Sequence, residues 1–142
     1  MFKIGILSTA NIATRHMIPA ILELKEQYAL QGIASRKMET ADKVAIQFDI
    51  QPYEGYDSLI NSNNIDVIYI PLPNSLHAEW IERALNKNLH VLVEKSMACN
   101  YEDVERLNRI ASSKKRMLVE NFQFRFHKQL AVLKNIVSNG NI

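Results

Sequence analysis

Short apolar runs alternate with helix-spaced segments along the whole chain, and this alternation limits the possible fold more than any other feature. The runs expected to form strands are Ile4–Leu7, Tyr28–Ala34, a short element near Pro52–Tyr53, Val67–Ile70, His90–Val93 and Met117–Glu120. Between them, apolar residues recur every three or four positions, as in an amphipathic helix. Six strands alternating with helices predict an α/β fold, with a mostly parallel sheet and helices on both faces. Right-handed crossovers favour the doubly wound strand order 3-2-1-4-5-6.

Three residues mark where helices begin or break. Pro19 lacks an N–H group, so we expect the first helix to form two pieces. Ser75, which follows an extended proline-containing loop, is expected to cap the helix after the fourth strand. Asn100 is expected to cap the helix after the fifth strand.

Residues 3–13, KIGILSTANIA, join the first strand to the first helix. A helix N-terminus presents unpaired N–H groups and the positive end of the helix dipole, so it can bind a pyrophosphate where the side chains are small. The dinucleotide fingerprint G-x-G-x-x-G/A falls on Ser8-Thr9-Ala10-Asn11-Ile12-Ala13, and only its last position matches as written. Alone this is a weak match. An ordinary buried strand and helix, with Asn11 as a cap, is an equal alternative.

Ser35 and Arg36 end the second predicted strand, where an Asp or Glu ordinarily binds the adenosine ribose diol. An arginine there accommodates a 2′-phosphate instead, which favours NADP as the cofactor, with NAD as the alternative. The other interpretation is an exposed arginine at a strand end that binds no ligand.

The loop after the fourth strand carries Asn74 and His77 and begins with Pro71 and Leu72. In the predicted strand order this loop lies beside the first strand, at the switch point where such sheets bind ligands. An imidazole there could bond a substrate hydroxyl or shuttle a proton. A structural histidine at a helix start is the alternative.

Glu94 and Lys95 end the fifth predicted strand. An ε-ammonium group near a nicotinamide can hydrogen-bond a reacting hydroxyl or carbonyl oxygen, and Glu94 could hold Lys95 in place. An ion pair that merely caps a strand is the alternative.

The segment ENFQFRFH leaves the sixth strand and carries Asn121 and Arg125. Its phenylalanines occupy alternate positions, which we expect to seat the segment on the core and to leave Arg125 facing the cleft. An interleaved aromatic and basic run also occurs in nucleic-acid-binding proteins. A net charge of only +2 does not support that interpretation.

The composition and motifs limit which classes of protein this chain can belong to. A chain of 142 residues has the length of one domain, and its apolar runs are too short to span a bilayer, so no membrane role is expected. The single Cys99 cannot form an internal disulfide, which favours the cytoplasm. No metal-ligand spacing, P-loop or G-x-S-x-G motif is present.

Together, five segments resemble the Gfo/Idh/MocA oxidoreductases, named for glucose-fructose oxidoreductase and inositol dehydrogenase: IGILSTANIA, IASR, PLPNSLHAEW, HVLVEKS and ENFQFRFH. The resemblance covers essentially the entire chain. It implies that residues 1–142 are a Rossmann domain that binds a nicotinamide dinucleotide. In this family an α+β domain follows and holds a sugar-like substrate, so we expect this chain to be the cofactor-binding half and inactive alone. A homo-oligomer is also consistent with the resemblance.

The resemblance also assigns roles to residues. Lys95 matches the lysine of the family's E-K-P motif, which binds the reacting hydroxyl and assists proton transfer, and His77 is the second catalytic candidate. The cofactor-binding candidates are Ser8, Thr9, Ala10, Asn11, Ile12, Ser35, Arg36, Pro71, Leu72, Asn74, His77, Glu94, Lys95, Asn121 and Arg125.

Three positions depart from the family pattern. Ser8 and Ala10 replace the usual glycines. Ser96 stands where the motif has a proline, often in a cis bond, so the turn that aims Lys95 is expected to be absent. The preferred interpretation is an NAD(P)-dependent oxidoreductase that interconverts a hydroxyl and a ketone on a sugar, sugar nucleotide or cyclitol. The alternative is a catalytically silent dinucleotide-binding subunit or sensor.

Overall fold

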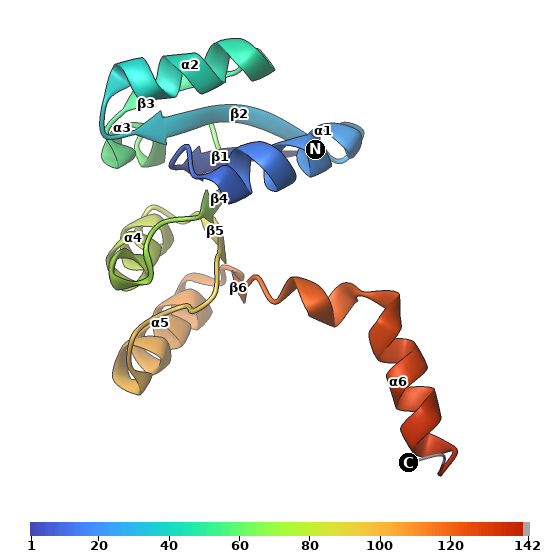
Figure 1. Cartoon of the computed structure of the whole chain (residues 1–142). Coiled ribbons are helices and arrows are strands. Elements are labelled where there is room, and N and C mark those ends of the chain that lie inside the picture. Colours follow the sequence, from blue (N-terminus) through green and yellow to red (C-terminus); the bar gives the residue numbers. More distant parts are fainter. Residues whose placement is uncertain (141–142) are drawn as a thin grey trace.

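A computed structural model describes residues 1–140 and contains one parallel β-sheet (Figure 1). Its strands are β1 (Phe2–Leu7), β2 (Tyr28–Ser35), β3 (Gln51–Glu54), β4 (Val67–Ile70), β5 (His90–Val93) and β6 (Leu118–Glu120). They lie in the order β3-β2-β1-β4-β5-β6, and each neighbouring pair is parallel. The predicted doubly wound order is therefore confirmed.

Helices connect the strands. The α-helices are α1 (Ile18–Glu23), α2 (Met38–Phe48), α3 (Tyr56–Ile60), α4 (Asn74–Asn86), α5 (Tyr101–Lys114) and α6 (Lys128–Ser138). A π-helical turn, η1 (Ala13–Met17), precedes α1, and a 3₁₀ turn, η2 (Gln123–Phe126), precedes α6. In η1 the N–H of Ile18 donates to the carbonyl of Ala13, five residues back, and Pro19 follows inside the first turn of α1. The first helix thus has two pieces, as predicted, because the chain changes its hydrogen-bond pattern just before the proline.

Apolar side chains pack on both faces of the sheet. On one face Ile4, Ile6 and Ile33 pack with η1, α1 and α2, and Tyr69 joins them from β4. On the other face Leu7 and its neighbours in β4 and β5 pack with residues of α3, α4 and α5. Successive strand residues point to opposite faces, so continuous apolar strands supply both clusters.

The face that carries α1 is partly open toward β6. A groove of about 360 Å³ runs between α1 and strands β4 to β6, and Met17, Leu24, Leu92 and Val119 are among its apolar lining residues. On this face the helical cover is therefore thinner over β4 to β6 than over β1 and β2, where η1, α1 and α2 pack.

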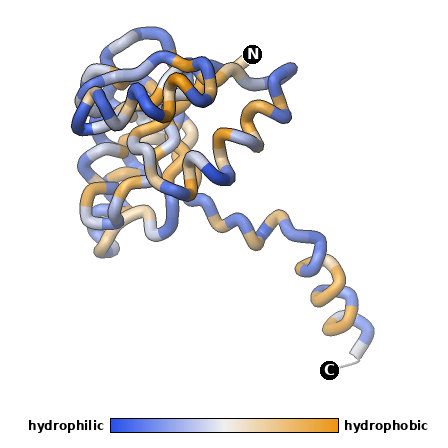
Figure 2. The backbone as a smooth tube through the Cα atoms, turned by 45° about the horizontal axis from the view of Figure 1, so that its top comes forward, coloured by the Kyte–Doolittle hydropathy of each residue, from blue (hydrophilic) through white to orange (hydrophobic). Residues whose placement is uncertain are grey.

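The segment after β6 leads away from the sheet as an arm formed by η2 and α6 (Figure 1). None of the residues in either element is buried, and Figure 2 shows apolar stretches along α6, apart from the body. Phe124 and Phe126 are 61% and 84% exposed, so the expectation that the phenylalanines seat this segment on the core is wrong. A 3₁₀ turn repeats every three residues, so alternate side chains do not share one face.

The predicted helix caps have different outcomes. Asn100 caps α5 as expected, since its side chain accepts from the Asp103 N–H at 2.8 Å. The predicted cap at Ser75 is wrong, because α4 begins at Asn74, directly after Pro73, without a side-chain cap. Pro73 itself occupies the cap position, with φ of −58° and ψ of 141°, so Ser75 already lies inside the first turn.

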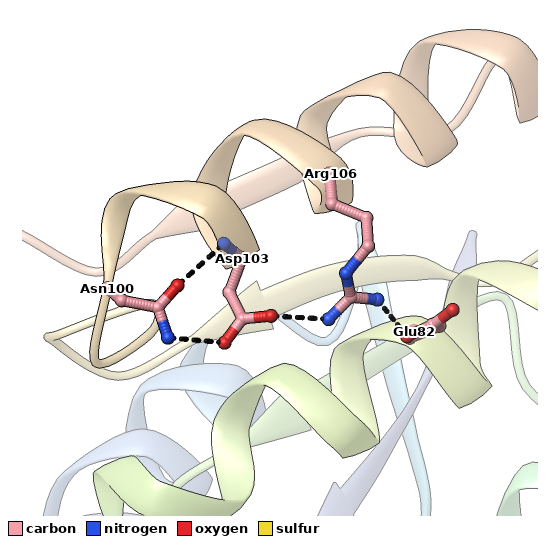
Figure 3. A network of polar contacts seen from close by, with 4 residues as sticks. All are labelled: Glu82, Asn100, Asp103 and Arg106. Carbon is pink, nitrogen blue, oxygen red and sulfur yellow. Dashed lines mark hydrogen bonds and ion pairs between the residues drawn. The ribbon is translucent and has the colours of Figure 1, made fainter.

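A polar network joins α5 to α4 on the outside of the body (Figure 3). Asn100 binds the Asp103 carboxylate, and Arg106 binds both Asp103, at 2.6 Å, and Glu82 of α4. The hydrogen bond from Arg106, followed by that from Asn100, holds the pKa of Asp103 below its usual value. No helix within residues 1–140 is long and apolar enough to cross a membrane.

Candidate functional site

The carboxyl ends of all six strands lie at one edge of the sheet, because every pairing is parallel. β1 pairs directly with β4, so the turn after β1 and the loop after β4 flank the point where the strand order reverses. Open α/β sheets bind ligands at such switch points. This edge is the candidate site.

The turn after β1 adopts a conformation suited to glycine although it contains a serine. Ser8 has φ of 115°, a value that side-chain-bearing residues rarely adopt. Its hydroxyl accepts from the Ala10 N–H at 3.0 Å, and the Ala10 carbonyl accepts from the Ala13 N–H at 2.9 Å. Within residues 1–140 the N–H groups of Asn11 and Ile12 have no such partner. They are therefore available for an anion at the start of the helical run.

The end of β2 carries Ser35 and Arg36. Ser35 is half-buried and its carbonyl accepts from the Gly55 N–H at 2.7 Å. Arg36 is exposed and forms no ion pair with any residue in the described part of the chain. Its guanidinium group is thus open to a ligand or to solvent.

A polar bridge joins the ends of β4, β5 and β6. Oε1 of Glu94 accepts from the Tyr69 hydroxyl at 2.6 Å and from Nδ2 of Asn121 at 2.7 Å. Tyr69 is only 1% exposed, and burial, followed by its hydrogen bond to Glu94, raises the pKa of the Tyr69 hydroxyl. The hydroxyl therefore stays protonated and remains a donor to Glu94.

Tyr69 was not among the predicted site residues. The available signal was a phenol within the buried run VIYI, because a buried tyrosine hydroxyl usually finds a hydrogen-bond partner. That signal indicates a polar contact without saying which distant residue makes it.

Lys95 is exposed and pairs with no acid between residues 1 and 140. The expectation that Glu94 holds its ammonium group is therefore wrong. Consecutive residues in extended backbone point to opposite sides, and Glu94 already binds Tyr69 and Asn121. The peptide bond between Lys95 and Ser96 is cis, so the turn expected to be absent without a proline is present.

His77 does not face the site. Its side chain is 0% exposed, with Nδ1 2.6 Å from the Ser96 carbonyl oxygen and Nε2 2.7 Å from the Leu72 carbonyl oxygen. Direct contact with substrate or cofactor, expected from its place after β4, is therefore contradicted. In the same loop Pro71 and Leu72 are buried, whereas Asn74 is exposed at the start of α4.

The residues after β6 separate into two groups. Glu120 accepts the Met97 N–H at 2.9 Å and Asn121 donates its N–H to the Val93 carbonyl at 2.8 Å, so both belong to the edge around Lys95. Arg125 is exposed on η2, in the arm that leads away from the sheet (Figure 1). The structure does not bring Arg125 into the polar bridge.

The geometry provides two kinds of chemistry at one edge. Among the described residues, the N–H groups of Asn11 and Ile12 and the exposed guanidinium of Arg36 suit phosphate groups. The exposed ammonium of Lys95 suits an oxygen that gains or loses a proton. No cluster of three or more His, Cys, Asp or Glu side chains within residues 1–140 is arranged to hold a metal ion.

The family model for oxidoreductases with an NAD-binding Rossmann fold, GFO_IDH_MocA, matches residues 2–122. A dTDP-3,4-didehydro-2,6-dideoxy-alpha-D-glucose 3-reductase from Actinomadura kijaniata is 37% identical over 140 residues, which are 99% of this chain and 42% of that protein. An inositol 2-dehydrogenase from Salmonella agona is 34% identical over 111 residues, which are 78% of this chain and 32% of that protein.

A crystal structure of a 3-ketoreductase from Actinomadura kijaniata, in complex with TDP-benzene and NADP, aligns with a TM-score of 0.95. Its sequence is 36% identical, and the alignment covers 99% of this chain and 44% of that one. The chain thus spans less than half the length of these relatives.

Proposed function

Because this chain belongs to the Gfo/Idh/MocA oxidoreductase family, we propose that it is the dinucleotide-binding part of an NADP-dependent oxidoreductase. The observation that carries the proposal is the exposed Lys95 at the end of β5, on a turn that part-buried hydrogen bonds hold at the edge of the sheet described above as the candidate site. A silent binding module would need no unpaired amine in this position.

The cofactor would bind along the edge from β2 to β5. The N–H groups of Asn11 and Ile12 would receive its pyrophosphate, aided by the positive end of the helix dipole. Ser35 and Arg36 would receive the 2′-phosphate, for which a cationic side chain and no neighbouring carboxylate are suited. Relatives described as binding NADP support this preference over NAD.

Lys95 would act on the oxygen of the substrate. When bound, NADP or its reduced form would accept or supply the hydride at the substrate carbon. In the oxidation direction Lys95 would bind the hydroxyl and relay its proton to an acid-base group of the substrate domain. In the reduction direction it would donate a hydrogen bond to the carbonyl and relay a proton from the same group. Asn74 and Asn121 would orient the cofactor from the neighbouring loops.

We propose a sugar, sugar nucleotide or cyclitol as the substrate class. The names of the two relatives described above are those of a reductase of a dTDP-linked didehydro sugar and of an inositol dehydrogenase, which supports this class. We also propose that a substrate-binding α+β domain completes the enzyme and that residues 1–142 alone bind cofactor without turnover. One reactant site would then be missing, and catalysis needs both reactants to be positioned. A reducing cytoplasm would suit the exposed, unpaired Cys99.

Calorimetric titration of the chain with NADP and NAD tests the binding proposal directly. We expect saturable binding of NADP, weaker binding of NAD, and no NADPH oxidation on a panel of keto sugars. Absence of binding to either cofactor would overturn the assignment, and turnover by residues 1–142 would overturn the need for a second domain. Sequencing the gene beyond the codon for Ile142 shows whether a substrate domain follows. A stop codon there would favour the sensor or subunit.

A further inference from the structure

The bridge across the ends of β4, β5 and β6 places one carboxylate from inside the fold. Tyr69 and Asn121 both donate to Oε1 of Glu94, at 2.6 and 2.7 Å. Tyr69 is 1% exposed and packs among apolar residues of β1, η1 and α1, so its ring is held by the core. The Tyr69 hydroxyl therefore fixes where the Glu94 carboxylate lies.

The second oxygen of this carboxylate is open to a ligand. A carboxylate has about four acceptor positions on its two oxygens, and both contacts of the bridge use Oε1. Oε2 accepts no hydrogen bond from residues 1–140, and no buried polar side-chain atom in that range lacks a partner. Oε2 of the half-buried Glu94 thus reaches the surface. An oxygen that can only accept suits a hydroxyl group of a ligand.

Glu94 lies between the loop after β4 and the exposed Lys95. Its N–H donates to the Ile70 carbonyl at 3.1 Å, which places it beside Pro71 at the start of that loop. With the 2′-phosphate at the end of β2 and the pyrophosphate after β1, the edge from β4 to β5 receives the nicotinamide half of the cofactor. The ribose of that half carries hydroxyl groups, which are the donors that Oε2 lacks.

We propose that Tyr69 is a positioning residue for the nicotinamide half of the cofactor. It holds Oε1 of Glu94, so that Oε2 accepts a hydrogen bond from a hydroxyl of the nicotinamide ribose. Tyr69 itself touches no ligand and acts only through Glu94. The inference rests on the function proposed above. Supporting bonds of this kind decide how accurately a ligand-binding group is placed.

Two ligands separate this role from a general effect on the fold. NADP contains the nicotinamide ribose, whereas adenosine 2′,5′-bisphosphate contains only the adenosine end. In Tyr69→Phe we expect the Kd of NADP to rise about tenfold, as for the loss of one charge-assisted hydrogen bond, and that of adenosine 2′,5′-bisphosphate to stay unchanged. Calorimetric titration measures both, with Tyr101→Phe, at an exposed tyrosine, as the matched control. Unchanged NADP affinity, or equal losses for the two ligands, would overturn the proposal.

A double-mutant cycle tests whether Tyr69 acts through Glu94. Glu94→Gln keeps an acceptor for the Tyr69 hydroxyl but replaces the free acceptor with an amide donor, so it should also weaken NADP binding. In the Glu94→Gln background, Tyr69→Phe should then add little, because residues in one hydrogen-bond network are not independent. Losses that multiply fully in the double variant would contradict the coupling.

The unsubstituted chain provides a readout if Tyr69→Phe does not fold. NMR can detect the hydroxyl proton of a buried, hydrogen-bonded tyrosine. We expect NADP to shift the resonance of the Tyr69 hydroxyl, because neighbouring hydrogen bonds polarise one another, and adenosine 2′,5′-bisphosphate to leave it in place. A resonance that does not respond to saturating NADP would overturn the proposal.

The two proposals fail in different ways. If the unsubstituted chain binds neither ligand, the proposed function fails and the role of Tyr69 fails with it. If the chain binds NADP and Tyr69→Phe binds it equally well, only the role of Tyr69 fails.

Discussion

The two ends of the candidate site are fixed in different ways. At the β2 end, Arg36 is exposed and meets no acid within the described residues. At the β5 end, Glu94 accepts two hydrogen bonds, and Tyr69, one of its two donors, is almost completely buried. The polar groups beside Lys95 are thus held by contacts within the described residues, whereas the Arg36 side chain takes part in none of the ion pairs there. In the function proposed above, the end where the hydride moves would therefore be preorganised, and the end that receives the adenosine would be ordered by its ligand. Preorganisation is most useful where chemistry takes place.

Replacing Lys95 tests the β5 end of the site and has the largest expected effect. In the protein completed with its substrate domain, Lys95→Met should lower kcat by about 10²- to 10⁴-fold, the usual contribution of general acid-base catalysis. Cofactor affinity and thermal stability should change little, because the Lys95 amine forms no ion pair with any of residues 1–140. Steady-state kinetics measure the effect, and Lys37→Met, at an exposed position after β2, is the control. A near-normal kcat in Lys95→Met would show that this end is only a structural strand terminus.

Replacing Arg36 tests the β2 end of the site. Arg36→Ala should weaken NADP binding about tenfold to a hundredfold and leave NAD binding unchanged, because a charge-assisted hydrogen bond contributes roughly 1.5–3 kcal/mol. Calorimetric titration of both cofactors checks this, with Arg15→Ala as an exposed arginine control. Equal losses for the two cofactors would remove Arg36 from the 2′-phosphate site.

Replacing Tyr69 measures how much the bridge stabilises the fold. Tyr69→Phe should lower the free energy of unfolding by about 1.5–3 kcal/mol, because it removes a donor to the Glu94 carboxylate. Urea denaturation gives this value, and Tyr101→Phe, at a residue 72% exposed, should have little effect. A loss no larger than that of the control would mean that the β5 end depends on packing alone.

Ser8 lies between the two ends and should show the smallest effect. Ser8→Gly should be more stable than Ser8→Ala by about 1–2 kcal/mol, since both lose the hydroxyl and only glycine tolerates φ of 115° freely. Thermal and urea unfolding of the two variants give the difference. Equal stability would show that the turn relaxes to another conformation and that its geometry is set by the neighbouring strands.

The strands and their order could be read from the sequence because the information is local. Val67–Ile70 is a continuous apolar run and His90–Val93 ends in one, and the structure places β4 and β5 at those residues. The crossover rule then leaves few arrangements of a chain in which strands and helices alternate.

The directions of the polar side chains could not be read in the same way. His77, Glu94 and Lys95 were correctly placed at the edge of the sheet, but which way each points depends on distant partners. Glu94 binds Tyr69, 25 residues earlier, and Asn121, 27 residues later. Neither separation leaves a local pattern in the sequence. The same holds for His77, because its neighbours in the sequence do not distinguish a buried histidine from one that faces the cleft.

The two outermost strands have a consequence for self-association. A strand at the edge of a sheet presents unpaired backbone groups that can add a strand from another molecule, and natural sheets limit this with short or proline-containing edges. β3 has four residues and includes Pro52, and β6 has three residues. We therefore expect edge-to-edge aggregation of this sheet to be disfavoured, even in a concentrated solution of the isolated chain.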